Sequence, residues 1–287
     1  MSSPSIHNPP YPSRRYAWLV VFLLIIASLV AFMDRQIVAI VVGPMQRDLG
    51  VGDTQIGWLY GIHALFYAFA AIPIASLADS RSRKHIIAIG VFFWSLMTII
   101  CGLTKNYTQI FLARIGVGVG EATLTPSTTS LIGDYFPRED VPLAMSIFQA
   151  GPIIGTGIAF IVGGFVLQLV EGASPLVLPI IGELVPWQQT FLYLGVPGIL
   201  LAFVMLLIRE PVRRPSESKI EGATNTEELI AFYRDNSKTI IFHHIGNLSL
   251  LMTGFAFVFW SITFFVRVHD MDASHASQIF GWIYIFF

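Results

Sequence analysis

Four ionisable residues lie inside stretches of the chain that are otherwise apolar enough to cross a lipid bilayer: Asp34 and Arg35 in the first stretch, and Arg114 and Glu121 in the fourth. An Asp, Arg or Lys at the centre of a membrane helix costs roughly 3 kcal/mol, so four such groups cost on the order of 10 kcal/mol without partners. Two acids and two bases are compatible with structural salt bridges between helices. We favour a paired, water-accessible site whose protonation or substrate occupancy drives a conformational change.

The composition indicates an integral membrane protein, because 54% of the residues are hydrophobic and only 12% are charged. The net charge of -1 gives no reason to expect nucleic-acid binding. The single cysteine, Cys101, excludes an intrachain disulfide and is interpreted as a packing residue. The sequence contains no metal-binding cluster, phosphate-binding loop or nucleophilic triad, so we expect neither an enzyme nor a cofactor.

Membrane-spanning helices need about 20 apolar residues, and the sequence contains seven such stretches and the start of an eighth. The predicted spans are 16–42, 54–78, 84–104, 107–135, 142–170, 188–208 and 239–268, and the eighth begins near Ala273. From Ser277 to Phe287 only 11 residues remain, about 16 Å of helix. We therefore expect a truncated chain whose carboxyl-terminal half is missing.

Basic residues distribute unevenly between the connections. Twelve Lys and Arg lie on the side of the amino terminus and three on the other side, so the positive-inside rule predicts a cytoplasmic amino terminus. That orientation disfavours a seven-helix receptor. We predict a cytoplasmic tail over 1–15, a six-helix transmembrane bundle over 16–208, a cytoplasmic linker over 209–238 and the start of a second bundle over 239–287, in a multi-pass protein of the bacterial inner membrane.

The loop after the second span resembles a signature of the major facilitator superfamily, G-x-L-A-D-R-x-G-R-K. Asp79, Arg83 and Lys84 match it. The departures are Ala75, Ser80 and Ser82. The resemblance implies an all-α membrane protein of the major facilitator fold, with two six-helix halves joined by a cytoplasmic linker. It also implies that the three matching residues belong to a cytoplasmic gate.

Two further motifs are similar to patterns of the same superfamily. In the fourth span, Arg114 is followed by Gly118 and Gly120, as in R-x-x-x-G-x-G, and Glu121 lies two helical turns from Arg114 on nearly the same face. The spacing of Gly116 and Gly120 permits close helix contact. The fifth span contains the antiporter-associated pattern G-P-x-x-G at Gly151, Pro152 and Gly155.

Within the superfamily, the chain most resembles the spinster-like transporters. The resemblance rests on the Asp34-Arg35 pair, on 53–58, on 118–122, on 186–188 and on 209–211. It implies transport of lipids or amphipathic organic anions, and a central cavity lined by Asp34, Arg35, Arg114 and Glu121. The alternative is an organic-anion:proton symporter of the hexuronate or aromatic-acid type. A membrane receptor or interaction protein is the non-transporting alternative.

The chemistry of the four charges suggests how protons and substrate could be coupled. A guanidinium is permanently charged and offers a bidentate fork to a carboxylate or phosphate. An anionic substrate could therefore displace Asp34 or Glu121 from an arginine, and a released carboxylate takes up a proton. The expected partners are a small-molecule or lipid-like substrate, the proton as coupling ion and the lipid bilayer. His63 and Asn247 are weaker candidates for the cavity, and packing is the simpler interpretation of His63.

Overall fold

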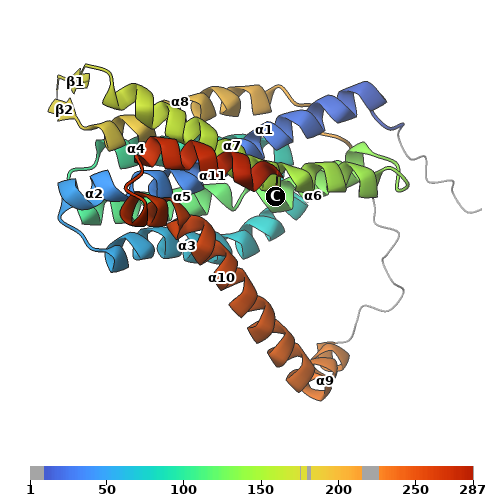
Figure 1. Ribbon diagram of the computed structural model, residues 1–287. Coiled ribbons are helices and arrows are strands. Elements are labelled where there is room, and N and C mark those ends of the chain that lie inside the picture. The colour runs from blue at the N-terminus through green and yellow to red at the C-terminus, as the bar shows by residue number, and fades with distance from the viewer. Residues whose placement is uncertain (1–9, 175, 180–181, 215–225, 287) are drawn as a thin grey trace, which may run out of the picture. The chain divides into compact units, whose positions relative to one another are not determined.

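The computed structural model describes residues 10–174, 176–179, 182–214 and 226–286 (Figure 1). The described residues form two compact units. The larger unit runs up to Val212 and resumes at Ile262, and the smaller runs from Arg213 to Ser261.

The elements of the described chain are almost entirely helical. In the larger unit they are α1 (Arg14–Ile40), α2 (Val42–Leu49), α3 (Asp53–Ser80), α4 (Arg83–Leu103), α5 (Tyr107–Glu121), α6 (Leu124–Tyr135), α7 (Val141–Glu171), strands β1 (Leu176–Leu178) and β2 (Gly182–Leu184), α8 (Pro186–Leu206) and α11 (Ala273–Phe286). The smaller unit contains α9 (Thr226–Asp235) and most of α10 (Ser237–Val268).

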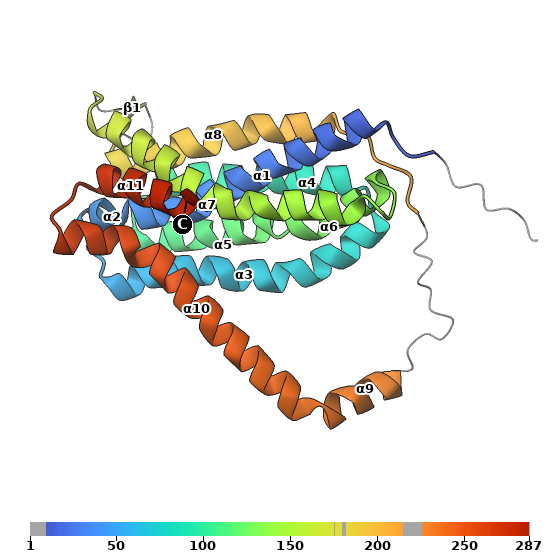
Figure 2. The same ribbon diagram turned by 45° about the vertical axis from the view of Figure 1, so that its right-hand side comes forward.

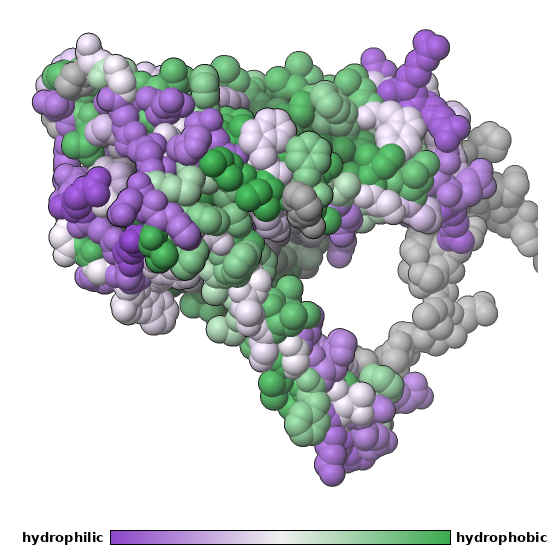
Figure 3. All heavy atoms as spheres, in the orientation of Figure 1, coloured by the Kyte–Doolittle hydropathy of each residue, from purple (hydrophilic) through white to green (hydrophobic). Residues whose placement is uncertain are grey.

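Six of the described helices are long and apolar enough to cross a membrane: α1, α3, α4, α7, α8 and α10. Those of the larger unit lie roughly side by side in a bundle (Figure 2). Apolar side chains cover much of the visible flank of this bundle, and hydrophilic ones gather at its two ends (Figure 3). An apolar belt between polar ends is the surface that a bilayer requires.

The sequence predicts one uninterrupted helix for the fourth span, and this prediction is wrong. The structure divides it into α5 and α6 at Ala122 and Thr123. Pro126 explains the break, because its ring nitrogen cannot donate to the carbonyl of Ala122 and its ring crowds that carbonyl. Ala122 and Thr123 both keep right-handed helical dihedrals, so α6 continues the span after the interruption.

Two short elements were not predicted. Strands β1 and β2 pair antiparallel between α7 and α8, with Leu176 opposite Leu184. α9 lies inside the segment 209–238 that the sequence predicts to be a linker. Neither the strand pair nor α9 contains the long apolar stretch by which the spans are recognised.

The helices that position the central charges pack closely. α3 packs on α5, α4 packs on both α5 and α8, and α1 packs on α7. A Cβ atom added to Gly118 of α5 would lie 2.4 Å from the carbonyl oxygen of His63 in α3. Only glycine allows this approach, which brings the imidazole of His63 to the level of Glu121, three residues further along α5.

Candidate functional site

An ion pair between α1 and α5 lies at the centre of the bundle. Arg35 Nε donates to Glu121 Oε2 over 2.6 Å. The side chain of Arg35 is 22% exposed, whereas that of Glu121 is completely buried. Both residues line a cavity of about 110 Å³ that also reaches Pro152 of α7. The pair is therefore open to a small space on the side of the arginine.

Aromatic rings hold the Arg35 guanidinium in place. Its central carbon lies 4.9 Å from the ring centroid of Phe32 and 4.9 Å from that of Tyr67. The Tyr67 hydroxyl shares a hydrogen bond of 3.1 Å with the Thr125 hydroxyl, which fixes that ring between α3 and α6. Within the described parts of the chain, the two terminal nitrogens of Arg35 make no hydrogen bond.

Asp34 and Arg114 lie directly behind this pair and do not line the cavity. Arg114 Nη1 donates to the backbone carbonyl of Asp34 over 2.9 Å, and both residues are completely inaccessible. Among the residues that the structure describes, neither carboxylate oxygen of Asp34 has a hydrogen-bond donor. Arg114 Nε and Nη2 have no acceptor among them either. The Thr98 hydroxyl is close to Asp34 but does not reach hydrogen-bond geometry.

His63 is part of the same cluster. Its Nε2 atom lies 3.3 Å from Glu121 Oε2, and its side chain is nearly as buried as that of the glutamate. The approach falls short of an aligned hydrogen bond. Arg35 and His63 thus meet the same oxygen, and Glu121 Oε1 has no partner in the described segments. The structure brings together all four predicted charges and His63.

The residues of the antiporter-associated pattern and Asn247 have different surroundings. Gly151 and Gly155 face α1, where added Cβ atoms would meet Ile25 at 3.4 Å and Leu29 at 2.9 Å, so they serve helix packing. Their neighbour Pro152 lines the cavity. Asn247 is exposed in the smaller unit.

A second buried arginine organises the end of the bundle where α3 ends and α4 begins. Arg83 Nε donates to Glu210 Oε1 over 2.8 Å, and Nη1 donates to Asp134 and to the carbonyl of Ser130. Nη2 reaches the carbonyl of Pro211 over 3.4 Å. Every nitrogen of this guanidinium therefore has a partner.

The other residues predicted for this gate differ in their surroundings. The Lys84 backbone N–H donates to Glu210 Oε2 over 3.0 Å, and its ammonium donates to the carbonyl of Leu206 over 3.3 Å. Asp79 is exposed near the end of α3. Burial acts to raise the pKa of Glu210, but the donors at Lys84, Arg83 and Ser82 outweigh it, so that this pKa lies below its ordinary value.

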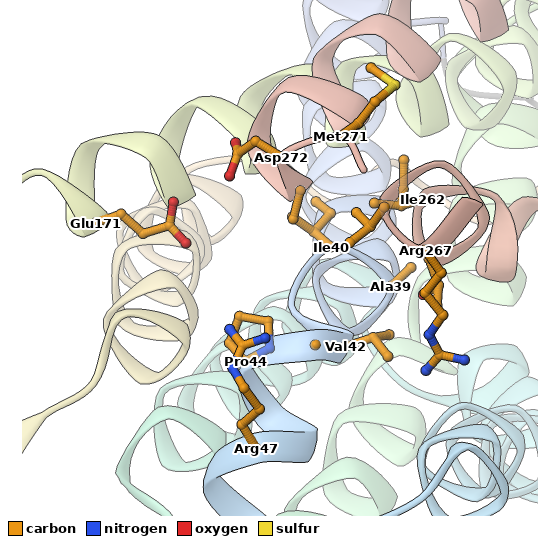
Figure 4. Close-up of a pocket in the computed structure, with 14 residues that line it drawn as sticks. Ala39, Ile40, Val42, Pro44, Arg47, Glu171, Ile262, Arg267, Met271 and Asp272 are labelled. Atoms are coloured by element: carbon orange, nitrogen blue, oxygen red, sulfur yellow. The ribbon is translucent and has the colours of Figure 1, made fainter. Parts of the chain in front are cut away.

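A pocket of about 190 Å³ opens at the opposite end of the bundle, between α2, α7, the last turns of α10 and the start of α11. Figure 4 shows four charged side chains around it, Arg47, Glu171, Arg267 and Asp272, over an apolar wall. The pKa of Asp272 is held below its ordinary value because the Ser274 hydroxyl donates to it, aided by backbone N–H groups at the start of α11.

At this end of the bundle, the guanidinium of Arg267 also forms a bidentate ion pair with Asp53. Its Nη1 and Nη2 donate to the two oxygens of Asp53 over 2.8 and 2.6 Å, and Nη2 donates to Gln46 over 3.0 Å. The ion pair joins the first residue of α3 to the last turn of α10. About half of each side chain is exposed. We call this pair with Gln46 the outer latch.

Sequence reasoning missed five of these residues: Gln46, Asp53, Asp134, Glu210 and Arg267. Asp53 and Glu210 gave a signal, because 53–58 and 209–211 both belong to the spinster-like pattern. The partners of Arg83 lie 51 and 127 residues away, a separation that no local pattern bridges. Among the described residues, no group of three His, Cys, Asp or Glu side chains could hold a metal ion.

Comparison with known proteins gives one consistent result. The family model of the Major Facilitator Superfamily matches residues 24–287. The chain is 30% identical over 189 residues to the "Probable L-galactonate transporter" of Escherichia coli (strain K12), covering 66% of this chain and 38% of that protein. It is 32% identical over 143 residues to the "Sphingosine-1-phosphate transporter SPNS2" of Danio rerio, covering 49% of this chain and 28% of that protein.

Among solved structures, a bacterial homolog of the human lysosomal transporter spinster, in an inward-facing and unoccupied conformation, is similar over 96% of this chain and 60% of its own. The TM-score is 0.82 and the identity 28%. The bundle therefore has the fold of a spinster homolog. The chain spans 38% of the length of the first of these two curated relatives and 28% of the length of the second.

Proposed function

Since this chain belongs to the Major Facilitator Superfamily, a family of transporters, we propose that it acts in secondary active transport of an organic anion by alternating access, coupled to protons. It is an integral multi-pass membrane protein. We place its amino terminus in the cytoplasm, following the excess of Lys and Arg on that side. The end of the bundle with Arg83 is then cytoplasmic, and the outer latch lies on the other side.

The observation that carries this proposal is the setting of Arg35. Its guanidinium lines the central cavity with both terminal nitrogens free of hydrogen bonds to the described residues, while only Nε is taken by Glu121. Two rings already confine the guanidinium beside the cavity, so an anion need only turn this group and does not have to order a mobile side chain. A terminal fork of this kind matches a carboxylate or a phosphate. Arg114 is completely buried and does not line the cavity, so we assign anion binding to Arg35.

The carboxylates supply the coupling to protons. An anion that draws Arg35 away removes the ion-pair partner of Glu121, and an unpaired buried carboxylate is costly enough to take up a proton. Asp34 is already in that situation, because no donor among the described residues reaches its oxygens. We infer that Asp34 holds a proton in this conformation. Glu121 takes up a proton when the substrate binds and loses it when the substrate leaves.

Two substrate classes share the chemistry that Arg35 recognises. A lipid-like or amphipathic anion is the first choice, supported by the similarity to a spinster homolog and to a transporter named for sphingosine-1-phosphate. A sugar acid carried by an organic-anion:proton symporter is the second, supported by the similarity to a probable L-galactonate transporter. The first presents a phosphate to the guanidinium and the second a carboxylate.

Uptake into proteoliposomes under an imposed pH gradient tests the proposal with both compounds. We expect saturable uptake of sphingosine-1-phosphate or L-galactonate that is reduced at least tenfold in Arg35→Lys, because the ammonium lacks the fork. Arg14→Gln is the matched control, since this arginine forms an exposed pair with Asp140. Glu121→Gln should bind anion but no longer respond to the pH gradient. Uptake that Arg35→Lys leaves intact would contradict the assignment of the anion site.

A further inference from the structure

His63 is the polar neighbour of Glu121 that the transport scheme leaves unused. The imidazole Nε2 lies 3.3 Å from Glu121 Oε2, the oxygen that also receives Arg35 Nε at 2.6 Å. Both the imidazole and the carboxylate are buried. A buried imidazole beside a buried carboxylate, with an arginine on the same oxygen, has two possible arrangements. Either the arginine compensates the carboxylate, or the imidazole does.

We propose that His63 is the exchange partner of Arg35: when the arginine turns to an anion in the cavity, His63 takes a proton and pairs with Glu121 in its place. The inference rests on the proposed function, since it names the residue that holds the coupled proton. No bond other than the one to this proton forms or breaks. One proton enters from the cavity and remains shared between His63 Nε2 and Glu121 Oε2 while the anion is bound.

The charges around the pair support this exchange. The charged groups that act on His63 are Glu121 and Arg114 from α5 and Arg35 from α1. Asp34 lies beyond Arg114, and Tyr60 lies one turn away on α3 itself. With Arg35 on Glu121, a second positive charge at His63 is repelled by two guanidiniums. Once the substrate anion has taken the charge of Arg35, that repulsion falls and the carboxylate is left unpaired.

The backbone makes the contact persistent. Gly118 lets the carbonyl of His63 rest against α5, so the imidazole stays beside Glu121 whichever way Arg35 turns. A residue placed there only for packing needs no polar atom. In the described part of the chain, His63 Nε2 makes no other ion pair or hydrogen bond, so Glu121 is the group with which it can pair.

Nitrogen NMR of the histidine side chains in the full chain tests the exchange without any substrate. Arg35→Gln mimics withdrawal of the arginine, and Arg35→Met is the alternative if that variant does not fold. At one fixed neutral pH, we expect the His63 imidazolium fraction to rise at least fivefold in the variant, and the rise to vanish when Glu121→Gln is added. His63→Gln assigns the signal, and His85→Gln, at an exposed histidine on Ser82, is the control.

An unchanged His63 signal in both Arg35 variants would overturn the proposal. A binding experiment distinguishes this failure from that of the transport scheme. With L-galactonate or sphingosine-1-phosphate, the wild-type dissociation constant should rise about tenfold per pH unit when one proton is taken up, and His63→Gln should remove that dependence. A dependence that persists in His63→Gln places the proton on a carboxylate and rejects His63. Absence of binding to wild type contradicts the substrate assignment, while the NMR result still decides the exchange.

Discussion

Arg83 and Arg114 are both fully buried arginines in the same bundle, and they differ in how their donors are satisfied. Arg83 places all three nitrogens on acceptors and meets two carboxylates. Arg114 makes one hydrogen bond, to a backbone carbonyl, and two of its nitrogens have no acceptor among the described residues. Satisfied networks rigidify a fold, whereas partly satisfied ones keep alternatives open. The first arginine therefore holds the helices together, and the second belongs to the cluster that we propose to rearrange.

The largest difference should appear when each arginine is replaced by methionine. Arg83→Met leaves two acids without their cation, which should lower the free energy of unfolding by about 3–5 kcal/mol. Arg114→Met should change it by about 1 kcal/mol or less, because an apolar side chain of similar length removes donors that had no acceptor. Thermal unfolding of detergent-solubilised protein measures both, with Arg14→Gln as the exposed control. Equal losses in the two variants would abolish the distinction.

Gly118→Ala tests whether the central cluster depends on helix placement. The added methyl would lie 2.4 Å from the carbonyl of His63, so α3 and α5 must separate, at a cost of about 1–3 kcal/mol. Proton coupling should fall as well, since His63 and Glu121 move apart. Gly133→Ala, where nothing lies within 4 Å, is the matched control and should be neutral or stabilising. Intact coupling in Gly118→Ala would show that the cluster tolerates looser packing.

Much of this architecture follows from the sequence, because long apolar stretches are a strong local signal. The predicted ends of the spans agree with the helix ends to within two residues, and the four intramembrane charges meet at one place. The rest depends on tertiary contacts. Helical period places Arg114 and Glu121 on one face, but only the neighbouring helices decide that the glutamate reaches the cavity and the arginine does not.

Glu210→Gln tests the satisfied cluster more gently. Its carboxylate accepts from Arg83, Ser82 and the Lys84 backbone, so loss of the charge should cost about 1–2 kcal/mol at neutral pH. The pKa of Glu210 in the folded protein lies below its ordinary value, so this stabilisation is present above the unfolded pKa of about 4.3 and is lost as the pH falls through the folded one. Unfolding curves of wild type and variant should therefore converge in acid. A gap that persists below pH ~3 would assign the loss to packing.

The outer latch should give the smallest energy and still affect conformation. Arg267 and Asp53 are half exposed, so a double-mutant cycle with Arg267→Gln and Asp53→Asn should give a coupling of about 0.2–1 kcal/mol that weakens with salt. A bias of that size changes the ratio of two conformations by up to about fivefold.

Thr263 lines the adjacent pocket and is buried, so Thr263→Cys reports opening there through its rate of maleimide labelling in a Cys101→Ser background. We expect Asp53→Asn to raise that rate several-fold and high salt to raise it in the protein with an intact latch. If neither change affects the rate, the fork is a surface contact, and the next candidate for closing this end is the packing of α7 on α11, where a Cβ atom added to Gly164 would lie 2.7 Å from the carbonyl oxygen of Ser274.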